Sequence, residues 1–384
     1  MSEWLSREEA LERLKVRPQT LYAYVSRGRI GMRPDHADPR RSEYRADDIA
    51  ALATRRARGR SPSAIAESAI AWGEPSIVTA ISTVWHGQLI YRGQDAAVLS
   101  EHATLEETAA LLWAMPQPAR FEAPLPDAPL QFGRASAFAQ LAMLAGQERP
   151  SLGRSAASLC ADAARAIGVL VGALGASAGT DPLHRRLARG WSVGDDVADA
   201  IRRALVLLAD HELNASTFAA RVAASTGASP AACLMAGLAT LSGPRHGGAG
   251  EAVMHLAEDA ARHGAEAAIR RWLGHDRPLP GFGHQLYPEG DPRATALLAA
   301  IGNSDETLQS LEAAAIAATG ARPNIDFALA VLTRGLGLPR DAPFQLFALG
   351  RSVGWAAHIV EQIMSGNIIR PRGRYDGLLP PTDR

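Results

Sequence analysis

The chain has 384 residues, of which 47% are hydrophobic, and its 40 basic and 40 acidic side chains give no formal net charge. This composition excludes a strongly charged chain and predicts a soluble globular protein with one large core, or a core and a small accessory domain. The charged N-terminus lacks the apolar core of a secretory signal, so we expect a cytoplasmic protein with no membrane partner. The longest nearly uncharged stretch, 166–179, is too short to span a bilayer and predicts a buried helix.

The first sixty residues form a basic segment, with 14 Lys or Arg against 9 Asp or Glu. Ser6 to Glu9 reads as a capping box, so a helix should start near residue 7. A second helix should run from Pro18 to Gly28, followed by a basic loop, a short extended piece at 43–45 and a helix opened by Asp47. The excess charge indicates either a module with an anionic partner or an ordinary charged surface.

This pattern resembles the small winged helix-turn-helix of excisionase and MerR-type regulators over about fifty residues. We therefore divide the chain into a helix-turn-helix domain at 1–55, a linker at 56–75 and a main domain at 76–384. The alternative is an appendage that keeps this fold and binds protein or nothing. The resemblance implies DNA contacts from the recognition helix and the wing, made by Arg17, Gln19, Thr20, Arg27, Arg40 and Arg41.

From residue 76 the chain reads as helices rich in Ala and Leu, broken by Gly and Pro, and predicts an all-α main domain. The exception is 84–93, where His86 and Gly87 predict a tight turn between two short strands. The two cysteines, Cys160 and Cys233, lie among small apolar residues, so we expect buried thiols rather than a disulfide or a metal site.

The sequence GPRHGGAG at 243–250 predicts a loop that places His246 just before a helix starting near Ala249. The unpaired N–H groups and the positive end of that helix should lower the pKa of His246 and keep the imidazole neutral. Gly247 and Gly248 leave the approach to the ring free of side chains. Such a histidine can donate a hydrogen bond to a developing enolate, although glycines beside a histidine also mark ordinary tight turns.

Further chemical groups lie in three other segments of the second half. His211 follows Asp210 ahead of an amphipathic helix, where capping or packing is the simpler interpretation. His284 follows a glycine-lined bend and precedes Arg293, and Asp326 enters an apolar helix either as a cap or as a base of raised pKa. Arg351 lies on a mostly apolar helix and needs a partner, which an ordinary buried salt bridge would also supply.

Three histidines, an aspartate and several arginines without metal-ligand spacing predict acid–base chemistry on a polyanion, with no metal. An aspartate would remove a proton from carbon while a neutral histidine stabilises the enol form. A second histidine would polarise a carbonyl, and arginines would bind carboxylates through paired hydrogen bonds. These roles together describe a Claisen-type condensation.

The segments DHELNASTF, GPRHGGAGEA, PGFGHQLYPEGDPRA, PNIDF and GRSVGWAAHIVEQ with IIRPRGRY resemble, in order, the signature segments of the citrate synthase family, from about residue 76 to the C-terminus. The resemblance implies a large helical domain and a smaller mobile helical domain at about 250–335, assembled as a homodimer or as an assembly of dimers. It implies oxaloacetate and acetyl-CoA as substrates, with no permanently bound cofactor.

The same resemblance assigns roles to individual residues. His246 matches the histidine that stabilises the acetyl-CoA enolate, His284 the one that polarises the oxaloacetate carbonyl, and Asp326 the general base. The remaining matches are to oxaloacetate-binding positions: His211, Arg293 and Arg351. Arg370 matches the substrate-binding arginine that one subunit contributes to the active site of its dimer partner.

Two departures from the family pattern concern binding rather than chemistry. Gly250 replaces an asparagine, and Pro288 and Glu289 follow Tyr287 where a basic residue is common, which bears on coenzyme A phosphate contacts. Two alternative functions stay open. A 2-methylcitrate synthase using propionyl-CoA would carry the same motifs, since one methylene changes binding by only ~1–3 kcal/mol. A transcriptional regulator would use the main domain as a sensor and the basic segment to bind DNA.

Overall fold

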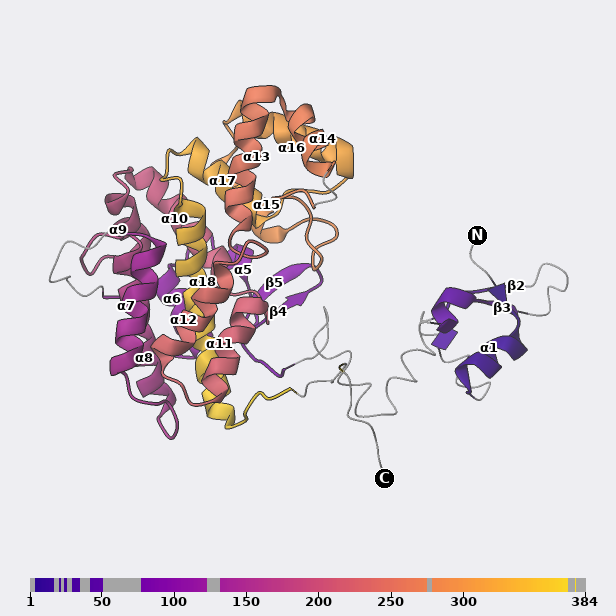
Figure 1. The fold of residues 1–384 in the computed structure, drawn as a ribbon, viewed down its shortest axis with the longest axis horizontal. Helices are drawn as coiled ribbons and strands as arrows, with labels where there is room; N and C mark the ends of the chain where they lie inside the picture. The colour runs from indigo at the N-terminus through magenta and orange to yellow at the C-terminus, as the bar shows by residue number, and fades with distance from the viewer. Residues whose placement is uncertain are drawn as a thin grey trace. The chain divides into compact units, whose positions relative to one another are not determined.

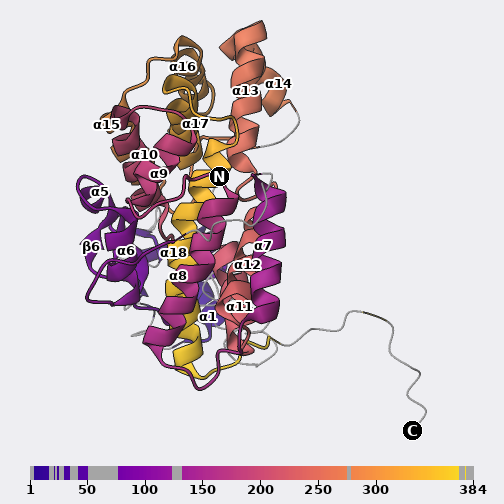
Figure 2. The ribbon, with the colours of Figure 1, turned by 90° about the vertical axis from the view of Figure 1, so that its left-hand side faces the viewer.

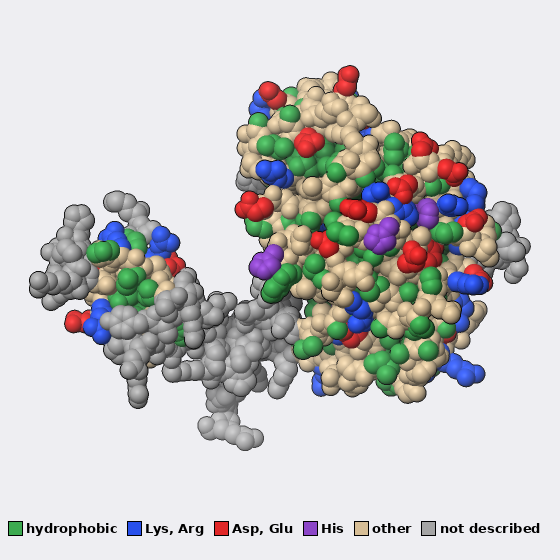
Figure 3. Space-filling view, turned by 180° about the vertical axis from the view of Figure 1, so that it is seen from behind, with side chains coloured by type: hydrophobic (Ala, Val, Ile, Leu, Met, Phe, Trp, Pro, Cys, Tyr) green, Lys and Arg blue, Asp and Glu red, His purple; other side chains and the backbone are tan. Residues whose placement is uncertain are grey.

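The computed structural model describes residues 4–16, 21, 24–25, 30–34, 42–50, 77–122, 132–274, 278–371 and 377. Contacts divide the chain into two compact units, one formed by residues 1–77 with 370–384 and the other by residues 78–369 (Figure 1). On the larger unit, acidic and basic side chains are interspersed across the face shown in Figure 3, in keeping with the balanced composition.

The smaller unit contains a three-stranded antiparallel sheet and a capped helix. Strands β1 (Trp4–Leu5) and β2 (Met32–Pro34) both pair with β3 (Ser42–Arg45). Helix α1 (Arg7–Leu14) begins at the predicted capping box, in which Ser6 Oγ accepts from Glu9 N and Glu9 Oε2 accepts from Ser6 N. Its core is made by buried side chains, among them Leu5, Leu14, Leu21, Tyr44 and Ile49.

The predictions for this unit are met in part. The extended piece at 43–45 lies in β3, and residues 46–50 are helical, so that helix begins one residue before the predicted Asp47. The DNA-contact residues all lie outside the described residues, and the helix-turn-helix stays a prediction: Arg17, Gln19, Thr20, Arg27, Arg40 and Arg41.

The larger unit opens with a small sheet of β4 (Ser82–Trp85), β5 (Gln88–Tyr91) and β6 (Gln94–Asp95). His86 and Gly87 form the predicted two-residue turn, with positive φ angles of 49° and 77° that suit a hairpin.

Helix α18 (Ala342–Ser365) runs through the centre of the helical bundle and is buried along most of its length (Figures 1 and 2). It packs against α6, α8, α10, α11 and α12. The bundle helices are α5 (Ala96–Leu99), α6 (Leu105–Trp113), α7 (Arg134–Gln147), α8 (Ala156–Ala173), α9 (Leu183–Gly190), α10 (Asp195–Leu208), α11 (Ala215–Ser225) and α12 (Pro230–Leu241). A helix surrounded in this way can present functional groups to several loops at once.

Helix α8 is the one described helix that is long and apolar enough to cross a membrane, yet 61% of it is buried inside the protein. A core helix of this length meets the same criterion. The buried helix predicted at 166–179 is only partly right, because α8 ends at Ala173 and Gly175 takes a φ of 92°.

A second hydrophobic cluster joins side chains between Val253 and Val331. The elements of this region are α13 (Ala249–His263), α14 (Ala265–Leu273), α15 (Pro292–Ile301), α16 (Glu306–Thr319) and α17 (Ile325–Gly335). Figure 1 shows α13, α14 and α16 together at one end of the larger unit. The cluster falls within the range 250–335 predicted for a smaller domain, whose mobility stays a prediction.

Candidate active site

Helix ends and loops from distant parts of the larger unit converge on one region. The charges of Arg293 and Arg351 both act on His211, and the charge of Arg351 acts on His246 and Asp326. The structure therefore brings together six of the seven residues predicted for catalysis and substrate binding, which are His211, His246, His284, Arg293, Asp326 and Arg351.

Two of the histidines lie against the same tyrosine. The ring centroids of His211 and His284 are 5.1 Å apart, edge to face, and His211 Nε2 lies 2.9 Å from the Tyr287 hydroxyl. His211 is buried and its side chain caps no helix, since Asn214 is the N-cap of α11. The capping interpretation of His211 is therefore wrong, whereas the packing interpretation agrees with the structure, because the ring lies against His284 and Tyr287.

All three histidines are kept neutral by their surroundings. Burial first, and then the nearby arginines, lower the pKa of His246 and of His284 to about 4 and that of His211 well below its usual value. We expected the start of α13 to lower the pKa of His246, but burial is the main cause and Arg351 the second. Neutral imidazoles near cationic guanidinium groups can act as hydrogen-bond donors at neutral pH.

The tautomer of His284 is set by the backbone. The amide N–H of Leu286 donates to His284 Nδ1 at 3.2 Å, so Nδ1 carries no proton. In the neutral ring the proton is then on Nε2, which is free to donate. The bend before it needs glycine, since Gly281 and Gly283 have φ angles of 83° and 73°.

The loop that carries His246 is built on close backbone contacts. A Cβ at Gly247 would lie 2.7 Å from Leu241 O, and one at Gly248 would lie 2.8 Å from Pro244 Cα. These glycines are therefore required by the packing of the loop itself, a stronger reason than access to the ring. Helix α13 begins at Ala249 as predicted.

A serine connects His246 to the bundle. Ser216 Oγ lies 2.8 Å from His246 Nε2 and 2.7 Å from Asn214 Oδ1, and it accepts a hydrogen bond of 3.1 Å from Trp355 Nε1. The single hydroxyl proton thus has two acceptors in reach. When Ser216 donates to His246, the imidazole proton must be on Nδ1, on the side of the ring away from the serine.

Arg293 is held in place by a buried carboxylate. Its Nε and Nη2 donate to Asp291 at 2.9 and 2.8 Å, and Asp291 also accepts from the amide of Ile325 at 3.0 Å. The pair ties the start of α15 to the start of α17. The arginine therefore reaches the site with part of its donor set already used.

Arg351 has hydrogen-bond donors that no described residue uses. Its Nε donates to Leu208 O at 2.9 Å, and Nη2 is buried with no hydrogen-bond partner among the described residues. Burial lowers its pKa to about 10, still well above neutral, so a buried cation without a described partner for Nη2 acts on His211, His246 and Asp326. Among the described residues Arg351 forms no salt bridge, so the structure does not show the ordinary salt bridge of the alternative interpretation. An anionic ligand would accept hydrogen bonds from its Nη2.

Asp326 is the residue that the sequence analysis predicted as the base. It lies in the first turn of α17, where Asn324 is the N-cap and accepts from the Asp326 amide at 3.0 Å. The aspartate is therefore not the cap. Burial raises the pKa of its carboxyl to about 6, against the opposing effect of Arg293, which suits a base that works near neutral pH.

The remaining sequence features are not part of this group of six residues. Arg370 follows α18 with an exposed side chain, and its contribution to a second chain stays a prediction. At Gly250 a Cβ would lie 3.1 Å from Pro343, so this packing disfavours the usual asparagine. A small cavity beside the His246 loop is lined by Arg134 and Arg340 among others.

Several residues that hold the site were missed by the sequence analysis, notably Ser216, Tyr287, Asp291, Trp355 and His358. The spacing of Arg351, Trp355 and His358, at i, i+4 and i+7 on one helix face, is the signal that could have indicated a shared role.

Residues 156–372 match the family model described as citrate synthase, C-terminal domain. The chain belongs to the citrate synthase family. Structural neighbours agree: the citrate synthase of Thermotoga maritima has a TM-score of 0.67 at 26% identity, over 81% of this chain and 95% of that one. Another is the Thermoplasma acidophilum enzyme in a ternary complex with carboxymethyl coenzyme A and oxaloacetate, with a TM-score of 0.68 at 26% identity over 80% and 95%.

Curated relatives include both kinds of synthase. Citrate synthase 2 of Bacillus subtilis is 40% identical over 189 residues, which are 47% of this chain and 51% of the relative. The 2-methylcitrate synthase 1 of Corynebacterium glutamicum is 38% identical over 199 residues, 48% and 51% of the two chains. In these alignments the chain spans about half the length of the curated relatives it matches.

Proposed function

We propose that this protein is an acyltransferase that condenses an acyl-CoA with oxaloacetate, in the manner of a citrate synthase. The observation that carries the proposal is the buried Arg351, whose Nη2 has no partner among the described residues, beside three histidines with lowered pKa values. A small dicarboxylate with a carbonyl supplies both the anion that the arginine needs and an acceptor for a neutral histidine.

Oxaloacetate binding is assigned to two arginines and two histidines of the site. Arg351 and Nη1 of Arg293, the guanidinium nitrogen that does not donate to Asp291, bind its carboxylates, with His211 as a further hydrogen-bond donor. His284 donates from Nε2 to the ketone oxygen, because its Nδ1 is already occupied by the backbone. Polarisation of that carbonyl makes its carbon the electrophile.

The acyl-CoA is activated by Asp326 and His246. The carboxylate takes a proton from the carbon next to the thioester, and Nδ1–H of His246 donates to the thioester oxygen as it becomes an enolate. This role requires Ser216 to donate its proton to Nε2. The enolate carbon then bonds to the oxaloacetate carbonyl carbon, and water hydrolyses the thioester to release free CoA and the carboxylic acid product.

The acyl chain is acetyl in our leading proposal and propionyl in the alternative, since the relatives include both kinds of synthase. The test is thiol release from acetyl-CoA and from propionyl-CoA with oxaloacetate present. We expect release with wild type and at least a ~10³-fold loss in Asp326→Ala and His246→Ala, on the scale of lost acid–base catalysis. Full turnover by either variant would refute the assigned roles, and the ratio of the two substrates identifies the synthase.

We also propose that the smaller unit binds DNA. Its own core, its capped helix and its antiparallel sheet support a separately folded module. A mobility shift of the full chain on DNA across a range of salt tests this. Sequence-dependent binding that survives physiological salt supports regulation, whereas binding lost at that salt favours an appendage without this role.

A further inference from the structure

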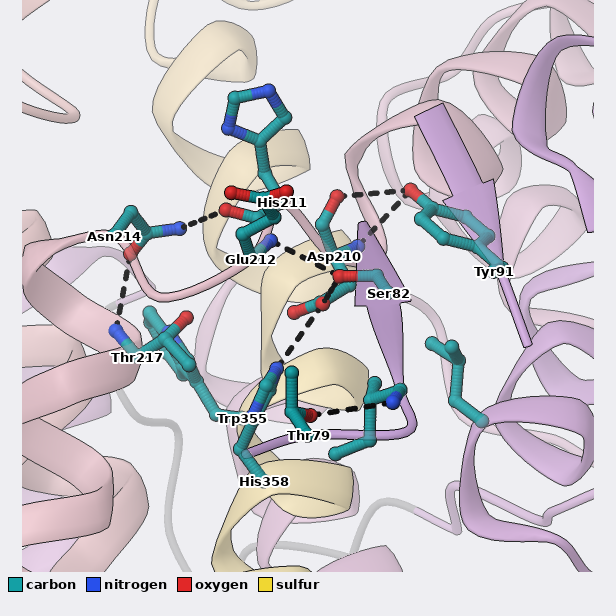
Figure 4. A network of polar contacts seen from close by, with 12 residues as sticks. Thr79, Ser82, Tyr91, Asp210, His211, Glu212, Asn214, Thr217, Trp355 and His358 are labelled. Carbon is teal, nitrogen blue, oxygen red and sulfur yellow. Dashed lines mark hydrogen bonds and ion pairs between the residues drawn. The ribbon is translucent and has the colours of Figure 1, made fainter. Parts of the chain in front are cut away.

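The loop between α10 and α11 carries the predicted oxaloacetate ligand His211 and lies directly on α18. Ala209 O accepts from Gly354 N at 2.9 Å, and a Cβ at Gly354 would lie 2.3 Å from both Ala209 O and Asp210 Oδ1. Figure 4 shows the His211 ring on one side of this loop and His358 on the other. Contacts that hold Asp210 in place therefore also fix the position of His211, the next residue of the loop.

Asp210 is buried within a set of polar contacts (Figure 4). Its backbone N and O both bond to the Tyr91 hydroxyl, at 3.1 and 3.0 Å. Its Oδ2 accepts from Ser82 Oγ and lies 3.2 Å from His358 Nε2. The carboxylate thus joins the first hairpin of the unit to its last helix.

The state of His358 follows from its other neighbour. Arg221 Nη1 lies 3.0 Å from His358 Nδ1, and a guanidinium can only donate, so Nδ1 is an acceptor without a proton. The proton is therefore on Nε2, and His358 donates it to Asp210 as a neutral ring. Arg221 is itself held by Glu361 at 2.6 Å and by Gln362 at 3.0 Å.

The loop needs such support because it contains a strained residue. Glu212 has a φ of 52°, a region that a residue with a Cβ adopts at a cost of order 1 kcal/mol. It is held there by Ser82 Oγ, which accepts from its amide at 3.0 Å, and by its own Oε1, which accepts from Val84 N at 2.7 Å. Ser82 therefore contacts both Asp210 and Glu212, the residues on either side of His211.

We propose that His358 is a positioning residue for the oxaloacetate half of the site, acting through Asp210 on the loop that carries His211. One helix face then serves the whole site: Arg351 for the substrate, Trp355 for Ser216 and His246, and His358 for Asp210. The inference rests on the proposed function, and it gives His358 a role that involves no contact with the substrate.

Two substitutions at position 358 separate the effect of the His358 hydrogen bonds from the effect of its side-chain volume. In His358→Gln the amide oxygen can accept from Arg221 and the amide nitrogen can donate to Asp210, whereas His358→Leu removes both bonds. We expect His358→Leu to raise the KM and the Kd for oxaloacetate about tenfold or more, as for a lost hydrogen bond to a charged group. The KM for acyl-CoA should stay within about twofold, and His358→Gln should restore oxaloacetate binding to within about threefold.

A second variant covers the case in which His358→Leu does not fold. Ser82→Ala removes one donor to Asp210 and should raise the oxaloacetate KM in the same direction. Its matched control is Ser352→Ala, a buried serine whose hydroxyl bonds to Leu349 O within its own helix, and which should leave both KM values unchanged. Oxaloacetate affinity is measured by calorimetry alongside thiol release and thermal unfolding.

The outcomes distinguish the two proposals. Unchanged oxaloacetate affinity in folded His358→Leu and Ser82→Ala would overturn the positioning role, as would equal losses in His358→Gln and His358→Leu. Wild-type protein that binds oxaloacetate but releases no thiol contradicts the proposed reaction, and the calorimetric comparison still tests the positioning role. A selective loss in oxaloacetate affinity, restored by glutamine, supports it.

Discussion

At the scale of single residues, burial shifts the pKa values of the histidines and of Asp326 in opposite directions. The three histidines are neutral because burial and nearby arginines oppose a positive charge, whereas burial of Asp326 opposes a negative one. The same desolvation thus yields neutral hydrogen-bond donors and a base of raised pKa within one region.

The pH dependence should report Asp326. As the base it must be ionised, so kcat/KM for oxaloacetate should rise with pH through an apparent pKa of about 6. The pKa values of His246 and His284 are lowered to about 4 and that of His211 well below its usual value, so the three rings are already neutral over this limb. A rising limb centred near pH 4 in the initial rates would contradict the assignment.

Asp326 also bears on stability. Its folded pKa of about 6 lies above the ordinary 3.8, so the folded state holds this proton more tightly and loses stability as pH rises between these values. Asp326→Asn should therefore abolish thiol release yet raise the free energy of unfolding at pH 7 by about 1 kcal/mol, allowing for partial exposure. Thermal melts at pH 4 and pH 7 check this, because the gain should vanish at the lower pH.

Ser216 should act on the chemistry of the acyl group. Ser216→Ala removes the hydroxyl that favours the Nδ1–H form of His246 when it donates to Nε2, so we expect kcat to fall about 10- to 100-fold with the oxaloacetate KM unchanged. Ser225→Ala is the control, since this serine lies in the same helix and bonds to Val222 O. Equal kcat values for the two variants would show that Ser216 is not needed.

At the scale of elements, α18 is the scaffold on which the loops are assembled. Arg351, Trp355 and His358 follow one another at i, i+4 and i+7, so they lie on one face of the helix. Gly354 lies between them and allows the 209–211 loop to contact the helix backbone. The helix thus needs a small residue at the point where its polar face meets the loop.

Gly354→Ala tests that contact. The added methyl would displace Ala209 and Asp210, so we expect about 1–3 kcal/mol of lost stability, as in an overpacked core, and a marked loss of thiol release. Gly146→Ala in α7 is the matched control, because no described atom lies within 4 Å of a Cβ there. Stability and activity of Gly354→Ala equal to wild type would show that the loop can move without consequence.

At the scale of the whole molecule, the chain has two compact units with separate cores. The buried apolar residues that the structure describes in the smaller unit form a small cluster, so we expect its stability to be low. The candidate site lies wholly in the larger unit.

Calorimetry of the full chain should therefore show two unfolding transitions. Oxaloacetate should raise only the one that belongs to the larger unit, by mass action. Leu14→Ala truncates a buried side chain of the smaller core. It should lower the free energy of unfolding of the smaller unit by about 2 kcal/mol or more and leave thiol release unchanged. A single transition that shifts as one with ligand would contradict independent units.

Local features of this protein were predictable from sequence because they depend on residues a few positions apart. The capping box at Ser6, the turn at His86 and Gly87, and the start of α13 at Ala249 are of this kind. Ordered motifs also indicated the citrate synthase family and which side chains to consider for the site.

Tertiary structure decided which groups those side chains meet. Ser216 and His246 are 30 residues apart in the chain, and Asp210 and His358 are 148 apart, so no local pattern could pair them. The cause of the lowered pKa of His246 was likewise decided by burial, which depends on the packing of several elements and not on the helix that follows it. The sequence determined which chemical groups are available, and the fold determined their partners, tautomers and pKa values, because these depend on contacts between distant segments.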